Sequence, residues 1–514
     1  MNRRTTLLSL AAALLLALPI AGVCAGESLR IQVFHTNDIH GWIMARPATY
    51  NKEDPSRMVG GAAVASNAIK KLSEPGVPRL LLDVGDWFQG TPEGNFTQGR
   101  SLAEYFNLLG YDALTVGNHE YDYGEENLKS LIGSINAPVL GANVLTAATN
   151  ERVPYLKPWI IKDVGGVKVG MFALITTGMS TLVFPKNFPG RAAGDEIEWA
   201  RKTVSELKAA GAEVVILLSH VGYADLDKTQ FKDDKAIATA VPGIDLIVGG
   251  HSHTLLKEPW REPKNGTLVV QTGSSLNRLG KVVLEIDPKT HKILRSEDKV
   301  YDLWVDQYGE DPAVLKLVEK YRKEVGSALD VVIGSSTVML RRERYEESSL
   351  GDWMCDCTRK YTKTQIAFQN SGGIRADLTA GPVTMRTVFS IMPFDNTLVT
   401  LTMTGAQLRE ALEHSVDGDR GILQVAGLTM RYEAAAPRGK KLREVLVGGK
   451  PLQDAESYSV TAADFVVGGG DGYASFQRGA DPAYTPVLVR DMLEWCVRNY
   501  SPLAMPTDGR IQKL

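Results

Sequence analysis

Residues 31–41 read Ile-Gln-Val-Phe-His-Thr-Asn-Asp-Ile-His-Gly, an apolar run that passes directly into a loop with Asp38, His40 and a glycine. This order, a short apolar run followed by a polar, Gly-containing loop, recurs through the first half of the chain. The runs cover residues 31–35, 79–84, 113–116, 167–174, 214–219 and 246–248. Near-continuous apolar runs that alternate with helix-like stretches are typical of strands covered on both faces. The sequence therefore predicts an α/β architecture.

Five of the loops that follow these runs carry side chains able to bind a metal ion. They contain, in chain order, Asp38 and His40; Asp86; Asn118, His119, Glu120 and Asp122; His220; and His251 and His253. In open α/β sheets, ligands bind beyond the carboxyl ends of the strands, which is where all five loops fall. One Asp or His after a strand is usually a turn residue, but five such loops in order, each with a glycine, indicate a metal site.

The donor types restrict the metals that this site would bind. Carboxylate, amide and imidazole groups without a thiolate suit Zn²⁺, Mn²⁺, Co²⁺ or Fe²⁺. The donors suffice for two ions, and a two-metal centre activates a water and stabilises both oxygens of an in-line displacement at phosphorus. We expect Asp86 to be the carboxylate that bridges the two ions, because it follows the second run and lies between the flanking sets.

Length and charge set further limits. A chain of 514 residues is too long for one hydrophobic core and fits two or three domains. The 57 Lys and Arg against 60 Asp and Glu give a net charge of −3, so no basic excess supports binding to a nucleic acid polymer. A helix is predicted to begin at Asp311-Pro312, with Val314, Val318 and Tyr321 among its apolar residues, and a second α/β-like region follows it.

The first 25 residues have the layout of a secretory signal peptide. Arg3 and Arg4 precede an apolar stretch over 5–21, and small residues end it at Ala25. We expect the mature protein to be exported to the periplasm or outside the cell. Lipidation at Cys24 stays open as an alternative, although Val23 is larger than the residue that usually precedes such a cysteine. No later run has the length of a membrane span, so no stable span is expected.

Three cysteines remain after removal of this segment: Cys355, Cys357 and Cys496. An odd number in an exported protein allows at most one disulfide and leaves a free thiol. Cys355 and Cys357 lie two apart on a predicted helix, where their side chains diverge, so we do not expect them to pair with each other. Which of the three cysteines, if any, form a disulfide stays open.

The strand-end motifs resemble those of the calcineurin-like metallophosphoesterases. The second half carries Asn370-Ser-Gly-Gly-Ile-Arg375, Pro393-Phe394, Asp464-Phe465 and Gly468-Gly-Gly-Asp471-Gly472, which resemble the C-terminal domain of the 5′-nucleotidase family. That family includes bacterial periplasmic UDP-sugar hydrolases. The resemblance implies a four-layer αββα sandwich over 26–305, a linker helix within 306–335 and an α/β substrate-binding domain over 336–514.

The same resemblance implies roles for the residues of the first domain. One metal ion would be held by Asp38, His40, Asp86 and His253. The other would be held by Asp86, Asn118, His220 and His251. His119 and Asp122 match the catalytic dyad, in which a protonated imidazole stabilises charge on the phosphoryl group and leaving oxygen while the acid orients it. Some relatives have Gln or Asn in place of His253, which leaves the metal preference open.

The resemblance also implies a substrate site in the second domain. Phe394 and Phe465 match two aromatic residues that stack on either side of the base. The residues matched to other substrate contacts are Arg344, Asn370, Arg375 and Asp471, the last of which would accept hydrogen bonds from ribose hydroxyls. Arg341 and Arg342 are near alternatives to Arg344, and His414 receives no role.

These expectations describe an exported dimetal phosphohydrolase that releases phosphate from nucleotides. The sequence leaves open whether the substrate is AMP, a UDP-sugar, a cyclic nucleotide or a dinucleotide, and which oligomer forms. One alternative is a thiosulfohydrolase of sulfur oxidation, which uses a related scaffold; the Phe394 and Phe465 pair speaks against it. Another is a non-catalytic nucleotide- or metal-binding protein, which would have no need for both a full ligand set and a dyad.

Overall fold

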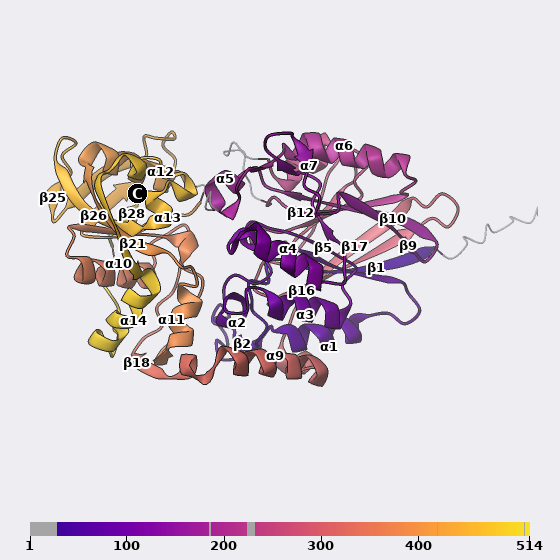
Figure 1. Ribbon diagram of the computed structural model, residues 1–514, viewed down its shortest axis with the longest axis horizontal. Helices are drawn as coiled ribbons and strands as arrows, with labels where there is room; N and C mark the ends of the chain where they lie inside the picture. Colours follow the sequence, from indigo (N-terminus) through magenta and orange to yellow (C-terminus); the bar gives the residue numbers. More distant parts are fainter. Residues whose placement is uncertain (1–27, 184–186, 224–231, 419, 508) are drawn as a thin grey trace, which may run out of the picture.

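The computed structural model describes residues 28–183, 187–223, 232–418, 420–507 and 509–514, which form two lobes (Figure 1). The predicted signal peptide at 1–25, including Cys24, lies outside the described residues. Within the described part of the chain, no helix combines the length and the apolar composition that a membrane crossing requires.

Two six-stranded sheets form the centre of the first lobe. One has the order β17 (Ile293–Asp302), β16 (Arg278–Ile286), β1 (Leu29–Thr36), β4 (Arg79–Val84), β5 (Ala113–Thr115) and β6 (Val139–Leu140). The other has the order β14 (Trp260–Arg261), β15 (Leu268–Val270), β13 (Leu246–Gly249), β12 (Val214–His220), β10 (Val167–Ile175) and β9 (Trp159–Val164). The six apolar runs predicted from the sequence are confirmed as the strands β1, β4, β5, β10, β12 and β13.

The two sheets pack face to face, with helices on both outer sides. Val33, Leu82, Met171 and Ile216 belong to the apolar layer between the sheets. Helices α1 (Ala62–Leu72), α3 (Arg100–Leu109) and α4 (Gly124–Ser134) lie on one side, and α6 (Glu196–Ala209) and α7 (Asp234–Ala240) on the other (Figure 1). Because both faces of each sheet are buried, their strands carry continuous apolar runs. The predicted four-layer αββα fold is confirmed.

This arrangement brings the five polar loops together. Strands β1, β4 and β5 are parallel neighbours in one sheet, and β12 and β13 are parallel neighbours in the other. Strand β12 also lies against β4 and β5 across the interface between the sheets. The carboxyl ends of all five strands therefore meet at one edge of the sandwich, where their loops face the second lobe.

The second lobe is also α/β. Its main sheet has the order β22 (Leu423–Ala426), β19 (Ile366–Asn370), β26 (Ser457–Ala463), β21 (Thr397–Thr404) and β27 (Ala480–Leu488). A smaller sheet has the order β25 (Lys450–Pro451), β24 (Leu442–Val447), β23 (Leu428–Tyr432) and β28 (Ile511–Lys513). The helices include α10 (Ser349–Thr362), α11 (Met385–Ile391), α12 (Gly405–Asp417) and α14 (Val489–Tyr500).

A disulfide joins Cys357 of α10 to Cys496 of α14, with 5.9 Å between their Cα atoms. Cys355 is a buried free thiol. The expectation of at most one disulfide and one free thiol is confirmed, and Cys355 and Cys357 are not paired with each other, as their spacing on a helix predicts.

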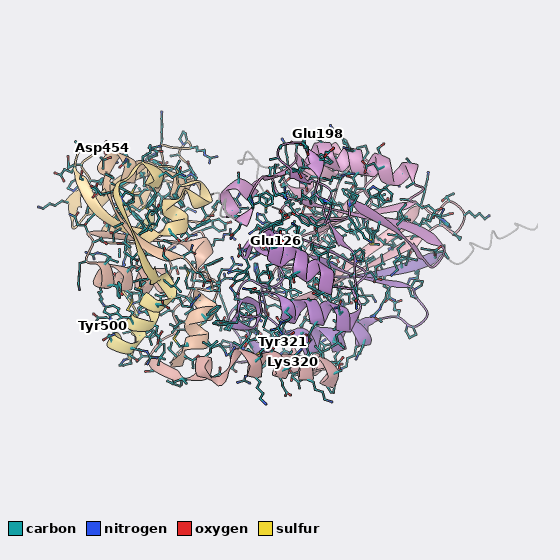
Figure 2. All side chains as sticks on the ribbon, in the orientation of Figure 1. Glu126, Glu198, Lys320, Tyr321, Asp454 and Tyr500 are labelled. Carbon is teal, nitrogen blue, oxygen red and sulfur yellow. A yellow bond between two sulfur atoms is a disulfide. The ribbon has the colours of Figure 1, made fainter. Side chains whose placement is uncertain are left out.

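Helix α9 (Pro312–Val325) lies between the two lobes in the chain but packs on the first. Asp311 caps its first turn by accepting a hydrogen bond from the N–H of Ala313 at 3.0 Å. Tyr321 is buried in the apolar cluster of the first lobe, and Lys320 pairs with Glu104 of α3 at 2.7 Å; Figure 2 labels both α9 residues. The chain then crosses to the second lobe through β18 (Val332–Ser336), which pairs with β20 (Gly381–Thr384) (Figure 1).

Candidate active site

The backbone at the strand ends adopts an unusual conformation. Five non-glycine residues in these loops have positive φ: Asp38 (50°), His40 (52°), Asp86 (55°), His251 (69°) and His253 (55°). This left-handed region is disfavoured for residues with a Cβ and occurs where the surroundings impose it, commonly at functional sites. Here the loops after β1 and β4 are joined by backbone hydrogen bonds, including His40 N–H to Asp86 O at 2.9 Å. All five residues are members of the two groups of metal-binding side chains described next.

The first group comprises Asp38, His40, Asp86 and His253, whose potential ligand atoms all lie within 4.8 Å of one another. Nε2 of His40 is 3.0 Å from Nε2 of His253 and 3.7 Å from a carboxylate oxygen of Asp86. Nε2 of His253 is 3.3 Å from a carboxylate oxygen of Asp38. Two imidazole nitrogens and two carboxylates therefore converge on one small volume.

The second group comprises Asp86, His220 and His251, again within 4.8 Å. Nε2 of His220 lies 3.3 Å from a carboxylate oxygen of Asp86. The amide oxygen of Asn118 lies 3.0 Å from Nδ1 of His251 and adds a fourth donor. Asp86 is common to both groups, the position that a bridging carboxylate would occupy.

The residues present fit a pair of divalent cations. Nδ1 of His40 donates to the carbonyl of Gln89 at 2.7 Å, and Nδ1 of His220 donates to the carbonyl of Val84 at 2.6 Å. A carbonyl can only accept, so in the neutral form of each ring Nε2 carries the lone pair on the Asp86 side, as in protein metal sites whose second ring nitrogen is held by a backbone group. Burial opposes protonation of His220, but the Asp86 carboxylate outweighs it and raises the pKa of His220 to about 10, so a cation bound there would displace a proton. Burial lowers the pKa of His40, His251 and His253, which favours the neutral imidazole that ligates a metal.

Glu120 holds two of these loops in place. Its carboxylate accepts hydrogen bonds from the N–H groups of Asp86 (2.8 Å), Trp87 (2.7 Å) and Gly117 (2.6 Å). Burial and the nearby Asp86 carboxylate raise the pKa of Glu120 to about 7. The sequence placed Glu120 inside a motif without giving it a role, because two of its three partners, Asp86 and Trp87, lie in the loop after β4, more than thirty residues earlier.

His119 and Asp122 lie side by side at the edge of the metal-binding groups. Nδ1 of His119 is 2.7 Å from a carboxylate oxygen of Asp122, and the backbone N–H of His119 donates to Asp86 at 3.0 Å. Burial opposes protonation, but the Asp122 and Asp86 carboxylates outweigh it and raise the pKa of His119. The arrangement favours an imidazolium in contact with the cavity.

A cavity of about 470 Å³ lies between the lobes and is lined by both. The predicted site residues that line it are Asp86, Asn118, His119, Asp122, His251, His253, Arg344, Asn370, Arg375, Phe394, Phe465 and Asp471. The other three, Asp38, His40 and His220, are buried in the ligand groups beside it. The structure thus brings together residues that are more than four hundred positions apart in the sequence.

The second lobe holds its side of the cavity in a defined geometry. Nδ2 of Asn370 donates to the Asp471 carboxylate at 2.8 Å, and Nε2 of His414 donates to the Asp471 carbonyl at 2.8 Å. His414, which received no role from the sequence, therefore supports the Asp471 turn. A Cβ at Gly470 would lie about 2.5 Å from the ring of Phe465, so only glycine lets this ring take its place.

Four arginines of the second lobe are separated by the structure. Arg344 lines this cavity, Arg341 and Arg342 line a second cavity between the lobes, and Arg375 lines both. Arg420 also lines the first cavity and was missed from the sequence. It comes soon after helix α12 in a stretch of sequence that resembles no motif, so no local signal distinguishes it from a surface charge.

Comparison with known proteins supports the same assignment in both lobes. Residues 31–255 match the calcineurin-like phosphoesterase family, and residues 326–478 match the 5′-nucleotidase C-terminal domain. The chain is 30% identical to Protein 5NUC of Lutzomyia longipalpis over 97% of this chain and 96% of that protein.

Two solved structures resemble the whole chain. The 5′-nucleotidase precursor from Thermus thermophilus has a TM-score of 0.86 and 29% identity, over 95% of this chain and 99% of that one. The sulfate thiohydrolase SoxB from the same species has a TM-score of 0.81 and 19% identity, over 94% of this chain and 96% of that one, a likeness of fold alone.

Proposed function

The chain belongs to the 5′-nucleotidase family of metal-dependent phosphoric ester hydrolases, and we propose that it releases inorganic phosphate from nucleoside monophosphates such as AMP. One observation carries this proposal. The aromatic and polar side chains suited to a nucleoside line the same cavity as the two groups of metal-binding residues and His119. A nucleotide bound there would have its phosphate beside the metal-binding groups.

Residues of the second lobe would bind the nucleotide. Phe394 and Phe465 would stack on the base, a contact that any base can make through its π face. Asp471, held by Asn370, would accept hydrogen bonds from the ribose hydroxyls. A substrate without a base or ribose would make neither contact and would therefore bind this cavity weakly. This disfavours the thiosulfohydrolase alternative.

Arg344 and Arg375 would contact the phosphate, since guanidinium groups match the geometry of phosphate oxygens. Two divalent cations bound by the groups that share Asp86 would polarise the phosphoryl group and lower the pKa of the attacking water. His119, with Nδ1 hydrogen-bonded to Asp122, would stabilise negative charge on the phosphoryl and leaving oxygens. Asp122 would keep the imidazole oriented and protonated.

We also propose where the enzyme acts and where its domains begin and end. The mature enzyme would begin after residue 25 and act in the periplasm or outside the cell, because the N-terminal segment has the layout of a signal peptide. The domains would span 26–305 and 336–514, with 306–335 between them. UDP-sugars, cyclic nucleotides and dinucleotides are further substrates that a base-stacking site would admit.

The test is phosphate release from AMP by the purified mature protein after removal of metals with a chelator. We expect no release in chelator and recovery on addition of Mn²⁺, Co²⁺ or Zn²⁺. His119→Ala should lower kcat at least about a hundredfold, the typical contribution of a positioned acid. Unchanged turnover in His119→Ala, or in Asp86→Ala, would contradict the proposal.

A further inference from the structure

A second cavity, of about 640 Å³, lies between the lobes next to the first. Five arginines line it: Arg46 from the first lobe, and Arg341, Arg342, Arg375 and Arg386 from the second. Its described acidic lining residues are Glu93, Glu343 and Asp377, so positive charge predominates. Arg375 lines both cavities, which makes them neighbours.

Two of the acids are already engaged by partners. Glu93 pairs with Arg386, which also pairs with Asp330 at 2.6 Å. The Asp377 carboxylate accepts hydrogen bonds from the backbone N–H of Arg342 at 2.9 Å and from the hydroxyl of Thr49 at 3.0 Å. Among the ion pairs of the described residues, none joins the guanidinium of Arg46, Arg341 or Arg342 to a carboxylate.

Arg46 is fixed in place with one donor nitrogen left over. Its Nη2 donates to the carbonyl of Ser275 at 2.7 Å and to the side chain of Asn277 at 2.8 Å, and its guanidinium lies 3.9 Å from the ring centre of Trp42. Its Nη1 is buried and has no hydrogen-bond partner within the described part of the chain. Because Nη1 has almost no accessible surface, an anion in the cavity would act on the Arg46 guanidinium through its charge and not through this nitrogen.

The positive charges of the neighbouring arginines also oppose one another. Nη2 of Arg386 is likewise buried and without a partner among the described residues. Burial lowers the pKa of Arg46 to about 9, and the positive charge of Arg342 contributes to that shift. Like charges held together in a partly enclosed space repel one another unless an anion lies between them.

We propose that this second cavity is an anion-binding site for a phosphate-class oxyanion. A tetrahedral oxyanion carries several acceptor oxygens and a negative charge, which would offset the positive charges of Arg46, Arg341 and Arg342 at this cavity. Because the arginines come from both lobes, the bound anion would also hold the lobes in the present arrangement. The ligand is either free inorganic phosphate or the phosphates of a longer chain such as pyrophosphate; the site is independent of the proposed reaction.

The test is calorimetric titration of inorganic phosphate into the full mature protein in chelator, at constant ionic strength. We expect saturable binding that weakens at least about tenfold in Arg46→Gln and in Arg342→Gln, because each substitution removes a positive charge from the cavity wall. Arg295→Gln, which removes an exposed arginine of β17, should bind as the wild type does. Tighter binding of pyrophosphate than of phosphate would identify phosphate chains as the ligand, and equal or weaker binding would identify free phosphate.

Arg344→Gln is the matched control, because Arg344 lines only the first cavity. Binding retained in Arg344→Gln and weakened in Arg342→Gln supports the proposal, whereas the reverse pattern places the anion in the first cavity and overturns it. Absence of saturable binding in the wild type also overturns it. Arg342→Gln keeps the test valid if Arg46→Gln does not fold. The Arg342 guanidinium donates a long hydrogen bond, 3.3 Å, to the carbonyl of Ile374, so its loss should disturb the fold little. Neither result depends on turnover, so the proposed function is tested separately.

Discussion

Nη2 of Arg375, in the second lobe, lies 2.9 Å from Nε2 of His40, in the first lobe. The same guanidinium is 5.8 Å from the ring centre of Phe394. Arg375 therefore connects the side chains suited to the nucleotide with those suited to the metal ions. Nε2 of His40 has a single lone pair, so a cation bound there would take the place of the Arg375 hydrogen bond.

We expect Arg375→Lys to lower kcat/KM for AMP at least about a hundredfold. Lysine keeps the charge but lacks the planar fork that makes two parallel hydrogen bonds to phosphate. Steady-state phosphate release measures the effect. Arg431→Lys, at an exposed position of β23, should behave as the wild type. Equal kcat/KM for Arg375→Lys and wild type would remove Arg375 from the substrate site.

Asp122 is expected to act only through His119. Asp122→Asn should lower kcat by about ten- to a hundredfold. The carboxylate lies 2.7 Å from Nδ1 of His119, and a neutral amide in its place would no longer stabilise the protonated imidazole. In a His119→Ala background, the same substitution should cost little more, since the two side chains work as one unit. A double-mutant cycle on kcat provides the measurement. Fully additive losses would show that Asp122 has a separate role.

Glu120→Gln tests the support of the metal-binding loops. Glutamine has one acceptor oxygen for the three N–H groups that Glu120 binds, and its amide nitrogen would face an N–H group. We expect metal affinity to fall about tenfold to a hundredfold, as for other residues that position metal ligands. Titration of Mn²⁺ into metal-free protein gives the affinity directly. Glu126→Gln, at an exposed site on α4 (Figure 2), is the control, and an unchanged affinity in Glu120→Gln would contradict this role.

Asp311 should make stability depend on pH. Burial raises its pKa, but hydrogen bonds from Lys70, Ser66 and the N–H of Ala313 outweigh burial and lower the pKa to about 2. A folded-state pKa below the unfolded value stabilises the fold above about pH 4, and this contribution is lost as the pH falls towards 2.

Asp311→Asn should therefore lower the free energy of unfolding by about 2 kcal/mol at pH 7, since each pKa unit is worth about 1.4 kcal/mol. The difference from wild type should shrink towards zero near pH 2. Urea unfolding at several pH values measures both. Asp306→Asn, whose carboxylate is exposed, should change stability by less than about 1 kcal/mol. A pH-independent difference for Asp311→Asn would show that the loss comes from packing instead of ionisation.

The strands and the donor loops could be predicted because their signals are local. An apolar run such as 79–84 and the glycine and acid that follow it are adjacent in the chain, and β4 begins and ends where the run does. Asp38 and His40, or His251 and His253, likewise carry a recognisable spacing within one loop. The linkage of Cys357 to Cys496 could not be predicted, because a cysteine count limits the number of disulfides but leaves the partners open.

The fold class, the five loops with their donor types and the motifs of the second lobe could all be predicted from the sequence, since each depends on residues close together along the chain. Three relationships emerge only once the chain is folded: Glu120 holds the loop of Asp86, Arg344 lines one cavity while Arg342 lines another, and Arg375 reaches His40. These relationships depend on which distant segments the packing of sheets and lobes brings within a few ångströms. Burial and unsatisfied charge arise from those neighbours, so they have no signature in any single stretch of sequence.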